Sequence, residues 1–264
     1  MPELAEVDYF RKQWAPGIGK FIVRVTIHPW TRLFRGMSSV DLAKMLPGSR
    51  MVESETHGKQ MLFRSDQEGW LGIHLGMTGA LSYTEEPDYD DRYAHLVIQT
   101  EEGFLVFNDP RQFGRVRFER SQAAPDWWAN LPPQVLSTEF SFERFQVMLK
   151  RRERSPLKPL LLMQELFPGV GNWMADEILW RSRLAPGRRA KSLSEIEQRV
   201  LFKQLLWVCR NALKVVADNW GDFPNTWLFN HRWKDGGSCP KTKQPLKRET
   251  IGGRTTCWSP AWQA

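Results

Sequence analysis

The amino-acid sequence predicts an α+β protein of two domains, in which an N-terminal β-sandwich with a leading helix precedes a helical domain that ends in a β-hairpin. Three observations support this prediction. Apolar residues of 3–14 recur at helical spacing, residues 20–119 hold short apolar runs between turns, and helical periodicity returns after residue 140. We place the N-terminal domain at 1–120, a linker at 121–137, the helical domain at 138–220 and a final region with the hairpin at 221–264.

The leading helix is predicted over residues 3–14. Its apolar positions are three and four residues apart, which places them on one face of an amphipathic helix, and Pro16 ends it. If that face is buried, Glu3 and Glu6 lie one turn apart, next to Pro2. The positions on the apolar face are Leu4, Val7, Phe10 and Trp14.

The start Met1-Pro2-Glu3 provides a candidate nucleophile. Removal of Met1 would leave Pro2 with a free secondary amine. An α-amino group titrates at about 7.7 to 8.0 and a lysine at about 10.4, so the terminal amine is neutral far more often at neutral pH. A secondary amine that attacks a sugar aldehyde forms an iminium ion, which is cationic without an added proton. Met-Pro starts are also common where they have no chemical role, so this start alone decides nothing.

Residues 20–119 have the pattern of a β domain. Short apolar or alternating runs are separated by Gly, Pro and acidic turns, which favours a β-sandwich or a barrel-like domain. We expect strands at Phe21–Val25, Met61–Phe63, Leu71–Ile73, His95–Ile98 and Phe104–Phe107.

Residues 121–137 lose this periodicity and contain several prolines, which indicates the connection between the domains. Helical spacing follows it, and turn residues with alternating apolar positions near the C-terminus predict the hairpin. The expected helices are 141–152, 156–166, 171–183 and 193–217, and the hairpin lies within 238–262.

The composition narrows the class of partner. A net charge of +7 and a pI near 9.4 favour an anionic partner, with nucleic acid first, although a basic enzyme with another substrate has the same balance. No run approaches the ~20 apolar residues of a membrane span, and the start lacks the basic and apolar regions of a secretory signal. Cys209, Cys239 and Cys257 are too few for a disulfide framework, so we expect a reducing cytoplasm.

Four turn-like segments carry side chains that could contact a ligand. The glycines before Asn172 precede a helix, where backbone amides and the helix dipole favour a phosphate, but a tight turn capped by Asn172 explains them as well. Lys59 lies at a predicted hairpin tip, where a solvated lysine is ordinary. The segments 73–79, with His74, and 108–114 are also turns, and each alone is explained as loop and core.

Together and in this order, these segments resemble the formamidopyrimidine-DNA glycosylase and endonuclease VIII family of base-excision repair enzymes, nearly from end to end. Family members open with Met-Pro-Glu-Leu-Pro-Glu-Val-Glu or a similar sequence, and this chain opens with Met1-Pro2-Glu3-Leu4-Ala5-Glu6-Val7-Asp8. The resemblance implies that Pro2 is the nucleophile at the sugar C1′ and that Glu3 is the general acid or base. It also implies that Glu6 supports the site and that Lys59 contacts the phosphate near the lesion.

The resemblance implies DNA-binding residues as well. His74 and Met77 come from one turn and Arg111 and Phe113 from the other, and Met77, Arg111 and Phe113 would fill the gap left by a flipped nucleotide. We call these three the wedge side chains. The helical domain would be a helix-two-turn-helix domain that binds phosphate through Asn172, and Arg254 would contact the same phosphates from the tip of the C-terminal finger.

The finger departs from the family. Many members carry two Cys-x2-Cys pairs, whose four thiolates hold zinc. Here the first pair is Cys239-Pro240-Lys241-Thr242 and the second is Cys257-Trp258-Ser259-Pro260, so half of the ligands are missing. We expect a zincless finger that retains only Cys239 and Cys257 and is held by packing; a zinc ion in the finger is the alternative. The segment 223–233 is more similar to plant-type zincless members, so we transfer no substrate preference across it.

The expected protein is a bifunctional DNA glycosylase that excises oxidised bases and cleaves the abasic site by β- or β,δ-elimination through a Schiff base at Pro2. The alternative is a catalytically inactive protein that binds damaged DNA with the same residues. We expect damaged double-stranded DNA as the partner, no cofactor, no membrane contact, a monomer, and a location in the bacterial cytoplasm, with the nucleoid. Purine or pyrimidine preference and the base opposite the lesion stay open.

Overall fold

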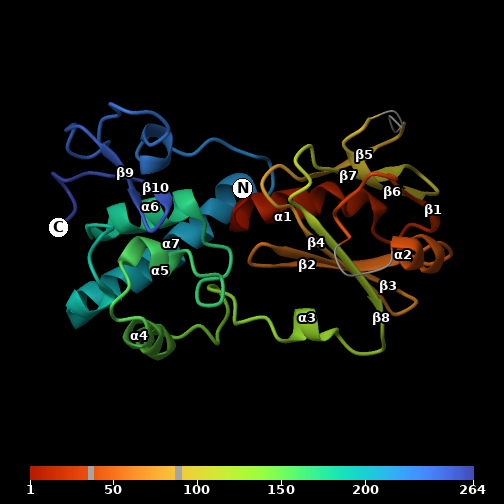
Figure 1. The fold of residues 1–264 in the computed structure, drawn as a ribbon, viewed down its shortest axis with the longest axis horizontal. Helices are drawn as coiled ribbons and strands as arrows, with labels where there is room; N and C mark the ends of the chain where they lie inside the picture. The colour runs from red at the N-terminus through yellow and green to blue at the C-terminus, as the bar shows by residue number, and fades with distance from the viewer. Residues whose placement is uncertain (35–38, 87–90) are drawn as a thin grey trace. The chain divides into compact units, whose positions relative to one another are not determined.

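The structure, a computed structural model, describes residues 1–34, 39–86 and 91–264. They divide into two units, Met1–Leu131 and Pro132–Ala264, which we describe separately (Figure 1). The predicted linker 121–137 is therefore split between the units. Its first part belongs to unit 1 because the Trp127 ring lies on Gly72 and the Trp70 Nε1 donates to the Ser121 carbonyl oxygen.

The leading helix α1 spans Leu4–Gln13, as predicted, and a short 3-10 helix, η1, follows at Ala15–Gly17. The buried face of α1 packs on the core of unit 1, where the Trp14 and Phe63 rings lie 4.8 Å apart. The Trp14 Nε1 donates to the Val106 carbonyl oxygen over 3.3 Å, which satisfies the one polar atom of this side chain. Helix α1 packs against β2, β3 and β5.

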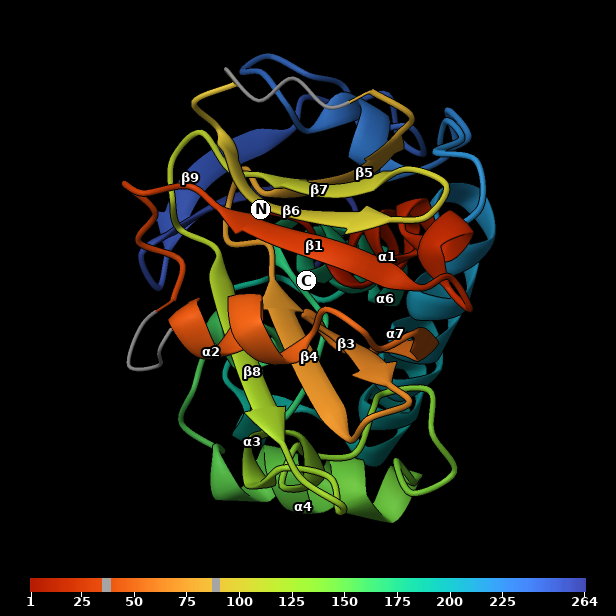
Figure 2. The same ribbon diagram turned by 90° about the vertical axis from the view of Figure 1, so that its right-hand side faces the viewer.

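Unit 1 is a β-sandwich of two antiparallel four-stranded sheets, with the apolar core between them (Figure 2). One sheet has the order β1-β6-β7-β5 and the other the order β2-β3-β4-β8. The strands are β1 Ile22–Ile27, β2 Met51–His57, β3 Gln60–Ser65, β4 Gly69–His74, β5 Ala80–Thr84, β6 Ala94–Thr100, β7 Phe104–Asn108 and β8 Arg115–Arg120. This fold class is the predicted one.

Three strands and two helices were not predicted; one of the helices is the short α3, Asp126–Ala129. Strands β2, β5 and β8 each lie at the edge of a sheet, where polar and charged residues are common and hide the apolar alternation. In β2, for example, Met51 is buried while Val52 and Glu53 are exposed. The helix α2, Ser39–Met45, covers the sandwich through the buried Leu42.

Unit 2 is mainly helical. Helix α3, Asp126–Ala129, still belongs to unit 1, and η2, Ala190–Ser192, connects α6 and α7. The helices of unit 2 are α4 Phe142–Arg151, α5 Leu157–Leu161, α6 Asn172–Ser182 and α7 Glu195–Val216. Three of them agree with the prediction within two residues. Helix α5 is shorter than the predicted 156–166, because the Gln164 side chain bonds the backbone of Leu162, Gly169 and Val170 and forms a turn there.

The predicted regions 138–220 and 221–264 form one unit, not two. They are joined by aromatic contacts, since the Phe223 and Phe229 rings lie 4.9 Å and 5.0 Å from the Trp173 ring of α6. After η3, Leu228–His231, the predicted hairpin is present as β9, Lys247–Ile251, and β10, Arg254–Trp258. Among the helices of the described residues, none is both long and apolar enough to cross a membrane.

Candidate functional site

The N-terminus of α1 holds the two predicted carboxylates beside Pro2. Glu3 is the N-cap of α1 and its side chain receives the backbone N–H of Glu6, while the Glu3 backbone N–H donates to Oε2 of Glu6 over 3.2 Å. This reciprocal capping box fixes both carboxylates one and four residues after Pro2. Pro2 directly precedes the N-terminus of α1, where the helix dipole stabilises negative groups. The structure therefore brings Pro2, Glu3 and Glu6 together.

Lys59 lies in the two-residue turn between β2 and β3. Gly58 precedes it with φ of 59°, which matches the positive φ that a tight hairpin turn of this kind requires at its first position. The lysine is only 8% exposed. It is therefore not a solvated turn lysine. Helix α1 contacts β2, because the Thr56 hydroxyl of this strand donates to Oδ1 of Asp8 over 3.4 Å.

His74 ends β4 and lies opposite Gln60, the neighbour of Lys59. Its Nδ1 accepts the backbone N–H of Gly76 over 3.1 Å, at the start of the turn that carries Met77. Burial, with the nearby charges of Lys59, Arg115 and Arg117, lowers the pKa of His74 to about 4. The imidazole is thus neutral at pH 7, so it can support the turn but cannot contribute a positive charge to DNA binding.

The wedge side chains lie on two adjacent loops. Met77 follows β4 and is 44% exposed, and Phe113, which precedes β8, is 47% exposed. The Arg111 guanidinium lies 4.7 Å from the centre of the Phe113 ring. The loops touch through backbone, since a Cβ on Gly76 would lie 2.4 Å from the carbonyl carbon of Phe113. The two loops are therefore adjacent, and together they carry all three exposed wedge side chains.

In unit 2, Asn172 is the first residue of α6 and Gly171 is its N-cap. The Asn172 Nδ2 donates to the Thr255 carbonyl oxygen of β10 over 2.9 Å. Gly252 and Gly253 form the β9–β10 turn with φ of 58° and 76°, both in the left-handed region. The exposed Arg254 follows directly. Asn172 and Arg254 are therefore joined by the hairpin.

A buried charged network supports this phosphate-binding candidate, and no sequence pattern identified it. The Lys158 ammonium is fully buried and donates over 2.6 Å to both the Asn172 carbonyl oxygen and Oδ1 of Asp176. Oδ2 of Asp176 accepts from the Arg232 guanidinium, at 2.6 Å, and from the backbone N–H of Cys257. The network links α5, α6, η3 and β10. In the sequence, the only indication of this network is Lys158, a lone lysine in the apolar run around 157–162.

The two cysteines of the finger have different surroundings. Cys239 and Cys257 are buried in one apolar cluster, but Trp180 donates to the Cys239 sulfur from Nε1 over 3.4 Å. Burial raises the pKa of the Cys239 thiol, but polar groups of Thr242, Ser259 and Trp180 outweigh it and lower that pKa to about 7. The Trp180 N–H is thus a hydrogen-bond donor to the sulfur of Cys239, inside the cluster that also holds Cys257.

Cys257 lies in β10, where burial and the charge of Asp176 raise the pKa of its thiol to about 11. Such a thiol stays protonated at neutral pH. Throughout residues 1–34, 39–86 and 91–264, no three His, Cys, Asp or Glu side chains come together in a group that could hold a metal ion.

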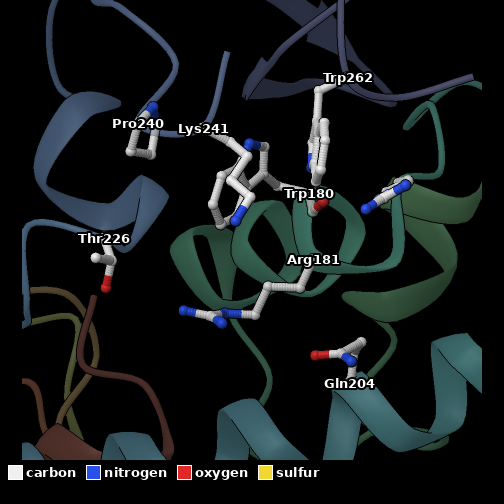
Figure 3. A pocket seen from close by; sticks show the side chains of 8 residues that line it. Trp180, Arg181, Gln204, Thr226, Pro240, Lys241 and Trp262 are labelled. Carbon is white, nitrogen blue, oxygen red and sulfur yellow. Dashed lines mark hydrogen bonds between the residues drawn. The ribbon is translucent and has the colours of Figure 1, made fainter. Parts of the chain in front are cut away.

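A hollow of about 440 Å³ lies at the opposite end of α6 from Asn172, between Trp180, Lys241 and Trp262 (Figure 3). Arg181 borders it, but Glu177 accepts from its guanidinium over 2.7 Å and the Trp207 ring lies 3.9 Å away. Burial raises the pKa of Glu177 to about 7. Arg181 is therefore held inside unit 2, and none of the predicted site residues lines this hollow.

Comparisons with known proteins cover the whole chain. The model of the formamidopyrimidine-DNA glycosylase N-terminal domain matches residues 1–116, and that of the formamidopyrimidine-DNA glycosylase H2TH domain matches residues 131–222. A formamidopyrimidine-DNA glycosylase from Roseiflexus sp. (strain RS-1) is 32% identical over 273 residues, which cover 100% of both chains.

Solved structures give the same similarity. The crystal structure of the MutM (Fpg) protein from Thermus thermophilus is 33% identical, with a TM-score of 0.81 over 99% of this chain and 98% of that one. A structure of MutM in complex with DNA that contains carbocyclic 8-oxo-G has a TM-score of 0.87 and 24% identity over 99% of each chain. The latter supports the fold alone.

Proposed function

Because the chain belongs to the formamidopyrimidine-DNA glycosylase family, we propose that it excises oxidised bases from DNA and then cleaves the abasic site through Pro2. Family membership supports a DNA glycosylase of base excision repair. The observation that carries the lyase step is the position of Pro2 directly before the capping box of Glu3 and Glu6. The secondary amine is the nucleophile, and the two carboxylates fixed beside it are its acid–base partners.

The first step requires that Met1 be removed. The Pro2 nitrogen then attacks the sugar C1′, and the bond from C1′ to the damaged base breaks with its electron pair leaving on the base. The base takes up one proton, and the amine loses its N–H proton, so the nitrogen is neutral before the ring opens. Opening of the C1′–O4′ bond leaves an iminium ion between Pro2 and C1′. One of the two glutamates, with Glu3 assigned first, acts in its protonated form and gives its proton to O4′ as the ring opens; the carboxylate that remains can serve as the base of the next step.

The second step uses the iminium ion as an electron sink. It acidifies the C2′ hydrogen, a carboxylate removes that proton, and the 3′ phosphate leaves with its electron pair, which completes β-elimination. Repetition at C4′ expels the 5′ phosphate and gives β,δ-elimination, and water hydrolyses the remaining imine. No cofactor enters either step, and we propose that the protein acts without one and as a monomer.

The DNA-binding part of the proposal rests on separate residues of each unit. In unit 1, the buried Lys59 would contact the phosphate near the lesion, and the wedge side chains would fill the gap in the duplex. An enzyme that flips a base out must offset a few kcal/mol of lost stacking. Contacts between the wedge side chains and the duplex would offset this cost. In unit 2, Asn172 and Arg254 would bind phosphates and position the duplex.

The test is a panel of end-labelled duplexes that carry 8-oxoguanine, formamidopyrimidine, thymine glycol or an abasic site. The proposal expects strand cleavage on at least one oxidised base and on the abasic site, and the chemical ends of the fragments distinguish β- from β,δ-elimination. Pro2→Gly replaces the secondary terminal amine with a primary one, and this variant should show strongly reduced cleavage. Binding to every duplex without cleavage of any would overturn the proposal.

A protein that binds damaged DNA without turnover is the second candidate, because the residues proposed to bind DNA do not depend on a free amine at Pro2. A retained Met1 would turn the Pro2 nitrogen into an amide, which is no nucleophile. Mass spectrometry of the mature N-terminus separates the two candidates. Enzyme activity requires a mass without Met1, whereas a mature protein with Met1 on every chain supports binding alone.

A further inference from the structure

Asp109 connects the two loops that carry the wedge side chains. Its side chain is 0% exposed, and its carboxylate receives donors from both loops. Oδ1 accepts the Thr78 hydroxyl over 2.6 Å, from the residue after Met77. Oδ2 accepts the backbone N–H of Gly114 over 2.7 Å, from the residue after Phe113. One carboxylate thus spans the distance between the two loops.

Further contacts fix Asp109 itself and the turn that follows it. Oδ1 also accepts the backbone N–H of Arg111 at 3.3 Å. The buried His95 bonds the Asp109 carbonyl oxygen through Nε2 over 3.1 Å. Gln112, between the two wedge side chains of this loop, has φ of 51°, a left-handed conformation that a residue other than glycine keeps only when its surroundings hold it. Asp109 supplies those surroundings at both ends of the turn.

The charge of this carboxylate is balanced by hydrogen bonds and not by a cation. Among the described residues Asp109 forms no ion pair, although a buried carboxylate is costly unless several donors satisfy it. A simple β-turn does not need such a group, because backbone bonds and a glycine suffice. The donors that satisfy Asp109 come from two loops far apart in sequence, so the carboxylate fixes the position of one loop relative to the other.

We propose that Asp109 is a positioning residue that holds Met77, Arg111 and Phe113 in one arrangement, so that they enter the duplex as a unit when a base is flipped out. This inference rests on the proposed function. A pre-organised wedge loses less side-chain and loop freedom on binding than two independent loops do. Loss of Asp109 should therefore impair the steps that need a filled gap and spare the chemistry at Pro2.

The test compares Asp109→Ala with Asp109→Asn and with Thr100→Val. Asparagine retains one acceptor for Gly114, and its amide can donate to the Thr78 hydroxyl, so it should rescue much of the effect. Thr100 is the matched control, because it is also buried in unit 1 and its hydroxyl closes the β6–β7 turn with Gly103 at 2.9 Å. Thr100→Val should lower Tm without altering the two loops.

Two substrates separate positioning from stability. One is a duplex with the oxidised base that wild type excises fastest, and the other is a single strand with an abasic site, which needs the Pro2 amine but no filled gap. Asp109→Ala should lower kcat/KM on the duplex by about 30-fold, since several kcal/mol of unstacking must be offset, and on the single strand by less than about 3-fold. Asp109→Asn should fall between Asp109→Ala and wild type.

Equal losses of Asp109→Ala on both substrates, or the same selective loss in Thr100→Val, would overturn the inference. A wild type that cleaves neither substrate would instead count against the proposed function. If Asp109→Ala does not fold, Thr78→Val removes one of the two loop donors and must show the selective loss. In the free protein, the Gly114 amide should also exchange with solvent faster in Asp109→Ala than in Thr100→Val, whatever the activity.

Discussion

The Asn172 side-chain amide donates from Nδ2 to the Thr255 carbonyl oxygen over 2.9 Å, and thereby joins the start of α6 to the C-terminal hairpin. The hairpin tip is held from a second side, because Gly252 lies against the Pro159 ring of α5. The exposed Arg254 lies between these two contacts. The helix terminus and Arg254 are thus parts of one rigid arrangement, which suits two groups that bind neighbouring phosphates.

Arg254→Ala should weaken binding to all DNA sequences by a similar factor and make the dependence of log K on log salt shallower by about 1, because one phosphate contact is lost. Binding titrations on unrelated duplexes at several salt concentrations measure both effects. Lys247→Ala is the control, since Lys247 is paired with Glu249 at 3.0 Å on the same hairpin. A salt slope equal to that of wild type in Arg254→Ala would exclude the phosphate contact.

Met77→Ala should reduce excision from duplex DNA by about 10-fold, or about 1.4 kcal/mol, because a smaller side chain fills the gap less well. Cleavage of single-stranded abasic DNA should be nearly unchanged. Val52→Ala removes another exposed apolar side chain of unit 1 and should affect neither substrate. Parallel losses on duplex and single strand would refute the wedge role of Met77.

Protonation of His74 should destabilise the protein in mild acid. Its pKa in the folded protein is about 4, below the ordinary 6.5, so between these values the unfolded chain binds more protons and the free energy of unfolding falls as pH falls. The contribution is fully present above pH 6.5, and its loss by pH 4 is on the order of 3 kcal/mol.

His74→Asn keeps an acceptor for Gly76 but does not titrate. The free energy of unfolding, measured by denaturant titration between pH 4 and pH 7.5, should therefore depend less on pH in this variant than in wild type. Burial also lowers the pKa of His95, so some dependence on pH will remain. Identical pH profiles of the two proteins would show that His74 is not held neutral.

Chelators should leave Tm and DNA binding unchanged, and metal analysis should find less than one zinc ion per chain. The reason is that the Trp180 N–H already donates to the Cys239 sulfur, and two thiolates cannot close a tetrahedral site. Thermal unfolding with and without EDTA measures the effect. One zinc ion per chain, whose removal lowers Tm, would contradict this account of the finger.

Much of the fold was predictable because its signals are local. The leading helix and the helices α4, α6 and α7 have regular apolar spacing over ten residues or more, and the buried strands have short apolar runs. The edge strands β2, β5 and β8 were missed because one side of each has no partner strand, so selection for apolar residues is weaker. The end of α5 was missed because the Gln164 side chain, and not a proline or glycine, forms the turn.

The position of a candidate site residue in the fold was predictable where that position depends on the residue's own segment. Pro2, Lys59 and Asn172 each lie at a turn or a helix end that the sequence marks. Lys158 and Asp109 could not be found in this way, because their partners lie 18 and 31 residues distant in sequence. The surroundings of the two finger cysteines could not be predicted for the same reason, since only the folded chain shows that Trp180 donates to the Cys239 sulfur.

The central claim is that the amine of Pro2 becomes covalently bound to the sugar. Borohydride reduction during reaction with abasic-site DNA, followed by proteolysis and mass spectrometry, tests it most directly. The account predicts a trapped complex in which the sugar is attached to an N-terminal peptide that begins at Pro2. Protein that has lost Met1, binds the DNA and cleaves it, but yields no adduct or an adduct only at a lysine, would contradict the claim.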